Sequence, residues 1–170
     1  MRVFSDRLVD QVDNDLISKN VIPDLVKEYF KDVEEYALKD PCIFGDYAMA
    51  DPTNDEAEDP RLYEDLGEIA TIKTKLDKML EDYGFDNKPM SLVLFADALM
   101  HVTKIHRIIR FPKGCGLLVG FGGSGKQSLT KLATFTACYD VFTINLIRGY
   151  KESDFRLDLQ TLYKTVLVKP

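Results

Sequence analysis

The chain has 170 residues, of which 45% are hydrophobic and 29% charged, and its net charge at pH 7 is −6. This composition is typical of a globular domain with a real core, and no apolar run approaches the ~20 residues of a membrane-spanning helix. The first residues do not have the pattern of a secretory signal, so none is expected, and the three scattered cysteines predict reduced thiols rather than a disulfide framework or a zinc site.

Charge is distributed unevenly along the chain. Residues 1–89 carry 23 acidic and 11 basic side chains, whereas residues 90–170 carry 5 acidic and 11 basic ones. The contrast indicates two units with different electrostatic roles. The basic half suits an anionic ligand, and the acidic half is equally well explained by solubility alone.

Helices are predicted through most of the first half. Apolar residues recur at helical spacing over residues 2–40, and Pro23 suits the first turn of a second helix. Residues 39–60 carry three prolines and many acids, which predicts a loop, either a solvated acidic connector or a second binding face. Residues 63–85 return to a helical pattern that Gly84 can close.

The second half predicts an alternation of strands and helices. Residues 91–110 form an amphipathic pattern that a Pro-Lys-Gly sequence ends. The apolar segments 115–120 and 140–146 predict two buried parallel strands. Helices are expected at 125–136 and 152–167, with Ser153 as the N-cap of the latter. This order is typical of an α/β fold.

The first predicted strand runs into a glycine-rich loop. Residues 120–126 match the phosphate-binding pattern G-x-x-x-x-G-K. Glycines allow backbone N–H groups to point at phosphate oxygens, the helix that follows adds its dipole, and Lys126 can reach the β- and γ-phosphates. The candidate nucleotide ligands are Gly120, Phe121, Gly122, Gly123, Ser124, Gly125, Lys126, Gln127 and Ser128. The alternative is a glycine-rich turn that binds no ligand.

The same residues also match the dinucleotide-binding motif G-x-G-x-x-G, at Gly120, Gly122 and Gly125. That motif needs an acidic residue at the end of the second strand to hold the ribose. The candidate, Asp140, precedes the strand and so stands at its wrong end. The pattern therefore favours a mononucleotide loop.

The magnesium position departs from the usual motif. A Ser or Thr hydroxyl normally follows the loop lysine and ligates Mg²⁺, but Gln127 stands there and Ser128 follows it. The amide oxygen of Gln127 can reach a hard cation, and Ser128 can do so only if the helix start shifts. We expect Gln127 and Ser128 as metal ligands, with an altered dependence on magnesium.

Hydrolysis needs groups that the sequence does not supply. A P-loop ATPase uses a later apolar strand that ends in Asp-Glu, and no such strand follows Ser128. We therefore assign no catalytic residue. Two strands alone rarely form a stable sheet, which leads us to expect part of a larger protein.

Several segments together resemble one family. "LLVGFGGSGKQSLTKLATF" resembles the phosphate loop of the fourth AAA+ module of axonemal dynein heavy chains, in which Gly-Lys-Gln-Ser recurs. The segments Arg2–Asp10, Asp59–Gly67, Lys88–Arg110 and Arg148–Tyr163 resemble the flanks of that module. The resemblance covers nearly the whole chain.

The resemblance implies an α/β fold: an incomplete P-loop (AAA+) large subdomain in residues 86–170, preceded by the helical lid and acidic connector of the third module in residues 1–85. It makes Leu92, Val93 and Leu94 candidate adenine contacts, although helix-start core packing explains them as well. It also implies ATP or ADP with Mg²⁺ at a regulatory site. The implied partners are other AAA+ modules of the same heavy chain and dynein subunits, with microtubules reached only through other parts of the parent. No nucleic acid or membrane is expected, and the implied location is the cytoplasm, the cytoskeleton and the axoneme of a cilium or flagellum.

Two other functions remain open on the residues alone. One is a small stand-alone P-loop protein, such as a kinase, which would need catalytic acids or a substrate lid within the 170 residues. The other is a non-enzymatic helical interaction module that docks through the acidic stretch 51–65. That module would be indifferent to nucleotide and to the substitution Lys126→Ala.

Overall fold

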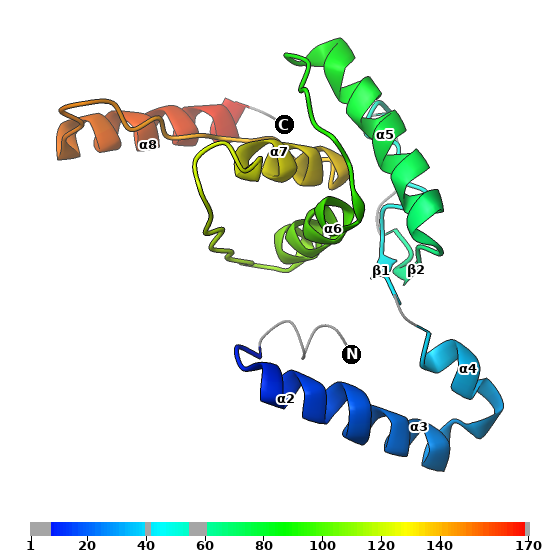
Figure 1. The fold of residues 1–170 in the computed structure, drawn as a ribbon. Coiled ribbons are helices and arrows are strands. Elements are labelled where there is room, and N and C mark those ends of the chain that lie inside the picture. Colours follow the sequence, from blue (N-terminus) through cyan, green and yellow to red (C-terminus); the bar gives the residue numbers. More distant parts are fainter. Residues whose placement is uncertain (1–7, 40–41, 55–60, 169–170) are drawn as a thin grey trace.

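The computed structural model describes residues 8–39, 42–54 and 61–168. Figure 1 shows a largely helical chain with one short two-stranded ladder. In chain order the elements are α2 (Gln11–Leu16), the π-helical turn η1 (Ile17–Val21), α3 (Ile22–Tyr29), the 3₁₀ turn η2 (Lys31–Val33), α4 (Glu34–Ala37), β1 (Phe44–Gly45), β2 (Glu64–Asp65), α5 (Ile69–Asp86), α6 (Ala96–Arg110), α7 (Lys126–Thr136) and α8 (Glu152–Val168).

The N-terminal helices follow the predicted pattern with one irregularity. Asp10 caps α2 by accepting a hydrogen bond from the backbone N–H of Val12 at 3.0 Å. Pro23 lies in the first turn of α3, as expected, but α2 and α3 are joined by the π turn η1 rather than by a break. Proline has no N–H to donate, and a local change of helical pitch accommodates such a gap. The parts of this prediction at residues 2–7 and 40 lie outside the described residues.

The acidic connector, defined here as residues 43–54 and 61–66, is docked rather than solvated. Strands β1 and β2 pair antiparallel, with Phe44 opposite Asp65, and close the connector at its base. Four apolar side chains of the connector are buried in the core: Ile43, Tyr47, Ala50 and Leu66. The prediction of a wholly solvated loop was wrong here, because the few apolar residues among the acids bury enough surface to hold the segment on the helices. Residues 55–60 of the predicted loop lie outside the described residues.

One core joins α5, α6 and α7 beneath the connector (Figure 1). It contains the apolar residues Ile72, Leu76 and Met79 of α5, Leu99, Val102 and Ile105 of α6, and Leu129, Leu132 and Ala133 of α7. The predicted helix at 125–136 is confirmed as α7, and that at 91–110 is confirmed as α6 from Ala96 on, whereas residues 91–95 are not helical. The predicted helix at 63–85 begins only at Ile69, as α5, and continues past Gly84 to Asp86. This core draws on residues both before and after position 85, and the division into two modules stays a prediction.

The two predicted strands are not formed. Residues 115–120 and 140–146 are extended but have no ladder partner among the described residues, and Leu117 is 90% exposed. A strand is stabilised by its neighbours in a sheet, so an apolar segment without such a neighbour stays an open extended chain.

The last helix, α8, begins at Glu152, as the pattern predicted, and the helical segment includes the expected N-cap residue. Ser153 therefore lies inside the helix and is not its N-cap, and the carboxylate of Asp154 accepts the backbone N–H of Lys151 at 2.8 Å. None of the described residues of α8 is buried. Within the described ranges, no helix is both long and apolar enough to cross a membrane.

Candidate functional site

The glycine-rich segment forms a tight, exposed loop that leads directly into α7. Gly123 and Gly125 both have φ of +77°, in the left-handed region that other residues rarely adopt. Beside Gly122 and Gly123 an added Cβ would meet nothing within 4 Å, so the space over the loop is open. Phe121 points away into solvent with 91% of its surface exposed, and only its backbone belongs to the loop.

Lys126, the first residue of α7, folds its side chain back over this loop. Its Nζ donates to the backbone oxygens of Gly120 at 2.8 Å and Phe121 at 2.7 Å, and to Oγ of Ser124 at 3.0 Å. All three acceptors are uncharged, and no carboxylate neutralises the ammonium within this set. The positive charge is therefore held at the mouth of the loop, where an anionic oxygen would be a stronger acceptor than a carbonyl.

The N-terminal end of α7 adds further donors. Gly125 is the N-cap residue and, having no side chain, caps nothing. The N–H groups of the first turn, which include those of Lys126, Gln127 and Ser128, have no acceptor within the helix. They point along the helix axis with the positive end of its dipole, which is the arrangement that binds phosphate.

The three candidate adenine contacts lie in different surroundings in the structure. Leu92 lies beside the loop, since its Cδ1 is 3.8 Å from the place of a Cβ on Gly125. Val93 is 79% exposed, whereas Leu94 is buried in the core with 3% exposure. Leu94 thus fits the alternative of helix-start packing, and adenine binding by the three residues stays a prediction.

The candidate metal ligands lie on the first turn of α7. Gln127 is exposed and Ser128 is half-buried, and both are neutral oxygen donors. No group of three or more His, Cys, Asp or Glu side chains suited to a metal ion occurs in the described part of the chain. Metal binding by Gln127 and Ser128 therefore stays a prediction.

The opposite end of α7 is closed by a Schellman motif. The N–H of Cys138 donates to the carbonyl of Phe135 at 2.9 Å, and the N–H of Tyr139 donates to that of Thr134 at 3.1 Å. Cys138 adopts φ of +57°, the left-handed conformation that this motif requires. The sequence carries cysteine where glycine is preferred, so the motif is built at some cost in backbone strain.

Two further carbonyls at this end are bound by the connector. The guanidinium of Arg61 donates to the backbone oxygen of Thr136 at 2.8 Å and to that of Ala137 at 3.1 Å. A cation at a helix C-terminus also complements the negative end of the dipole. The last carbonyls of α7 therefore all have partners.

A series of hydrogen-bonded polar side chains is buried beside this end of α7. His106 of α6 is 2% exposed, its Nε2 bonds Oδ1 of Asp46, and its Nδ1 lies 2.8 Å from Oγ1 of Thr136. Asp46 also accepts from Nε of Arg110 at 2.7 Å.

Burial alone would raise the pKa of Asp46, but the hydrogen bonds and charges of His106 and Arg110 outweigh it and hold that pKa below its usual value. Burial lowers the pKa of His106, against the opposing effect of Asp46. Since Asp46 is then a carboxylate and only accepts, Nε2 of a neutral His106 carries the proton. The Thr136 hydroxyl has one proton and lies 2.8 Å both from Nδ1 of His106 and from the carbonyl oxygen of Ala133.

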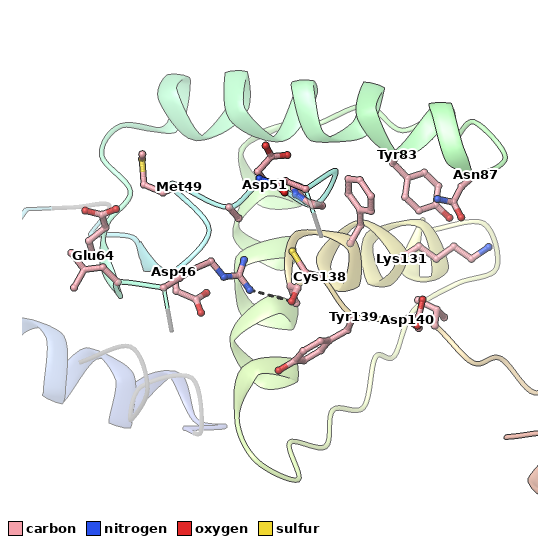
Figure 2. Close-up of a pocket in the computed structure, with 18 of the residues that line it drawn as sticks. Asp46, Met49, Asp51, Glu64, Tyr83, Asn87, Lys131, Cys138, Tyr139 and Asp140 are labelled. Atoms are coloured by element: carbon pink, nitrogen blue, oxygen red, sulfur yellow. Dashed lines mark hydrogen bonds between the residues drawn. The ribbon is translucent and has the colours of Figure 1, made fainter. Parts of the chain in front are cut away.

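A cavity of about 1140 Å³ opens between the connector, the end of α5 and the end of α7 (Figure 2). Figure 2 shows Lys131 and Asp140 on one side of it, Tyr83 of α5 and Asn87 just after α5 along another, and Asp46 and Glu64 across from them. Asp140, the acid required by the dinucleotide reading, lies here at the far end of α7 from the glycine-rich loop. This placement weighs against the dinucleotide-binding motif.

The sequence did not single out His106, Asp46 or Arg61. His106 follows Leu99 and Val102 at helical spacing, so the sequence places this histidine on the apolar face of α6. That position could have predicted its burial. The partners Asp46 and Arg61 come from a distant segment and left no local signal.

Comparison with known proteins points in one direction. Residues 90–170 match the family described as "P-loop containing dynein motor region D4". Over 163 residues, 96% of this chain, the sequence is 50% identical to human "Dynein axonemal heavy chain 10". It is 46% identical over 166 residues to "Dynein-1-alpha heavy chain, flagellar inner arm I1 complex" of Chlamydomonas reinhardtii, and 39% identical over 168 residues to human "Dynein axonemal heavy chain 2". The chain spans about 4% of the length of each of these relatives.

Proposed function

Because the chain belongs to the axonemal dynein heavy chain family, we propose that it contributes a nucleotide-binding element to a dynein motor region, with the phosphates held by residues 120–128. The observation that carries this proposal is the geometry at the start of α7. There, two left-handed glycines, an uncapped helix N-terminus and the ammonium of Lys126 converge on one open space.

The residues present fit ATP or ADP. The first-turn amides and Lys126 would bind the β- and γ-phosphate oxygens, and Ser124 would be released from Lys126 to bond a phosphate or water. Leu92, next to Gly125, would pack against the nucleoside. Mg²⁺ would neutralise phosphate charge, with Gln127 and Ser128 as its protein oxygen donors.

The role proposed for this site is regulatory. Residues 120–128 supply donors for phosphate but include no acid that could act as a base or position a water. Bound nucleotide would then act by changing the conformation of the motor region. We extend to this chain the axonemal location that the names of its relatives carry, together with partnership in a dynein complex and with further AAA+ modules of the heavy chain.

A titration with fluorescent ATP tests the proposal. We expect saturable binding that Lys126→Ala weakens by about a hundredfold or more, because a charge-assisted contact to phosphate is lost. The matched control is Lys131→Ala, which removes a lysine of the same helix that lies away from the loop. Repeating the titration in EDTA shows whether Gln127 and Ser128 complete a metal site. Equal affinities of the two lysine variants would contradict the proposal.

The helical interaction module remains a second candidate, because Asp51 stays exposed while the apolar side chains of the connector are buried. It predicts unchanged behaviour of Lys126→Ala in every assay. The same titration therefore decides between the two.

A further inference from the structure

The C-terminal end of α7 is held by two separate arms of the connector. Arg61 binds the backbone oxygens of Thr136 and Ala137, and Asp46 reaches the side chain of Thr136 through His106. Both arms thus converge on the last turn of α7, with Arg61 75 residues before Thr136 and Asp46 90 residues before it. We call Asp46, Arg61, His106 and Thr136 the α7 clamp.

The two arms are linked to each other at the base of the connector. Asp46 directly follows β1 and Arg61 stands three residues before β2, and these strands pair with each other. The ladder is extended by the N–H of Leu66, which donates to the carbonyl of Ile43 at 2.8 Å. A shift of the last turn of α7 is therefore transmitted to the connector through both arms together.

Helix α7 itself is suited to carry such a shift. It is 11 residues long, about 16 Å, and its Leu132 and Ala133 are completely buried against α5 and α6. A packed helix moves as a rigid body more readily than it bends. Its first residue is Lys126 and its last is Thr136, so it joins the glycine-rich loop directly to the clamp.

The clamp can open without melting the helix. The Schellman motif already satisfies the carbonyls of Thr134 and Phe135. If Arg61 withdraws, only the carbonyls of Thr136 and Ala137 lose their partner, and they adjoin an open cavity that water can enter. Release of Arg61 would therefore leave the Schellman motif and the rest of α7 intact.

We propose that phosphate binding at the start of α7 and closure of the α7 clamp are coupled, with Arg61 and Asp46 as positioning residues through which the connector responds to nucleotide. This inference rests on the proposed nucleotide-binding function. By linkage, whatever stabilises the closed clamp also tightens nucleotide binding, and the reverse holds by the same factor.

Hydrogen–deuterium exchange of the 170-residue chain, with and without saturating Mg-ATP, tests the coupling. Amides of residues 120–128 report binding, and those of the connector, such as Ala50 and Leu66, report the clamp. We expect ATP to slow exchange at both places, by about fivefold or more in the connector. In Arg61→Ala, saturating ATP should still slow amide exchange in the loop but no longer slow it in the connector. The affinity for ATP should fall by about fivefold.

Arg156→Ala is the control, because Arg156 makes an exposed ion pair with Glu152 on α8, and it should behave as the wild type. Arg61→Lys keeps the charge but lacks the forked pair of donors. Its ATP affinity and its connector protection should lie between those of the wild type and those of Arg61→Ala. Protection of the loop without protection of the connector in the wild-type chain would overturn the coupling and leave nucleotide binding intact. A connector effect that persists in Arg61→Ala would overturn the role of Arg61. No protection at either place would contradict the proposed function and the coupling with it.

Discussion

The two ends of helix α7 are built in opposite ways. At its start the backbone is exposed, two glycines adopt left-handed conformations, and the first-turn N–H groups have no side-chain cap. At its end every one of the last carbonyls has a partner, supplied by a Schellman motif and by Arg61. The same helix thus has one end open to a ligand and one end fixed to the rest of the protein.

This difference separates binding from anchoring. Unpaired backbone donors are tolerated at the open end because water reaches them, and a phosphate can replace that water. At the fixed end the side chains of His106 and Thr136 are buried, so each needs an internal partner and the loss of one is costly. Substitutions at the fixed end should therefore change stability first, and substitutions at the open end should change nucleotide binding first.

The largest effect on stability is expected from Asp46→Ala. It leaves the Nε2–H of buried His106 and the Nε–H of Arg110 without their carboxylate, and should lower the free energy of unfolding by about 3 kcal/mol. Urea denaturation measures this loss. Asp15→Ala is the matched control, since Asp15 bonds only the exposed side chains of Lys19 and Gln11, and it should change stability far less. Equal losses would show that the fixed end is not held by this chain of polar groups.

Lowering the pH should destabilise the protein through the buried polar groups at the fixed end of α7. The pKa of His106 is lowered by burial, so the unfolded chain binds more protons than the folded one below about pH 6.5 and stability falls as the pH drops through that range. Asp46, whose pKa is also lowered, adds a further loss below about pH 4. In His106→Gln the first of these losses should disappear from the pH dependence of urea unfolding. An unchanged profile would contradict burial of a neutral His106.

A smaller effect is expected at the open end from Gly125→Ala. Its φ of +77° disfavours any side chain, so the substitution should cost about 1 kcal/mol of stability. The control is Gly122→Ala, at a position without a left-handed φ, where an added Cβ meets nothing within 4 Å, and we expect little change in stability. Thermal unfolding of the two variants in the absence of nucleotide gives the comparison. A larger loss for Gly122→Ala would mean that the loop has a different conformation.

The smallest effect should come from Cys138→Gly, which relieves strain at the fixed end. Cys138 occupies the left-handed position of the Schellman motif, where glycine is preferred, and the substitution should raise stability by about 0.5 kcal/mol. Urea denaturation under reducing conditions measures it. Destabilisation would indicate that the side chain of Cys138 contributes packing that outweighs the strain.

Local patterns were sufficient to predict the helices of the core. The apolar spacing in residues 91–110 and the pattern after Gly125 gave α6 and α7 close to their observed bounds, because one face of each helix is buried. The glycine-rich loop was recognisable from its residue types, since glycine spacing and a following lysine are local properties.

Features that depend on distant partners were not predictable. The segments 115–120 and 140–146 have the composition of strands, but a strand forms only beside another strand, and the described chain places none there. The contacts of Asp46 with His106 and of Arg61 with Thr136 join residues 60 and 75 positions apart. Nothing in the immediate sequence of Asp46 distinguished it from the solvated acids around it.

The most direct test is to follow the backbone amide resonances of the chain as Mg-ATP is added. We expect the largest shifts at Gly125, Lys126 and Gln127, at the open end of α7, with smaller shifts carried to Cys138 and Tyr139. Shifts concentrated around the cavity at Lys131 and Asp140, with the loop amides unmoved, would place the nucleotide elsewhere and contradict the account.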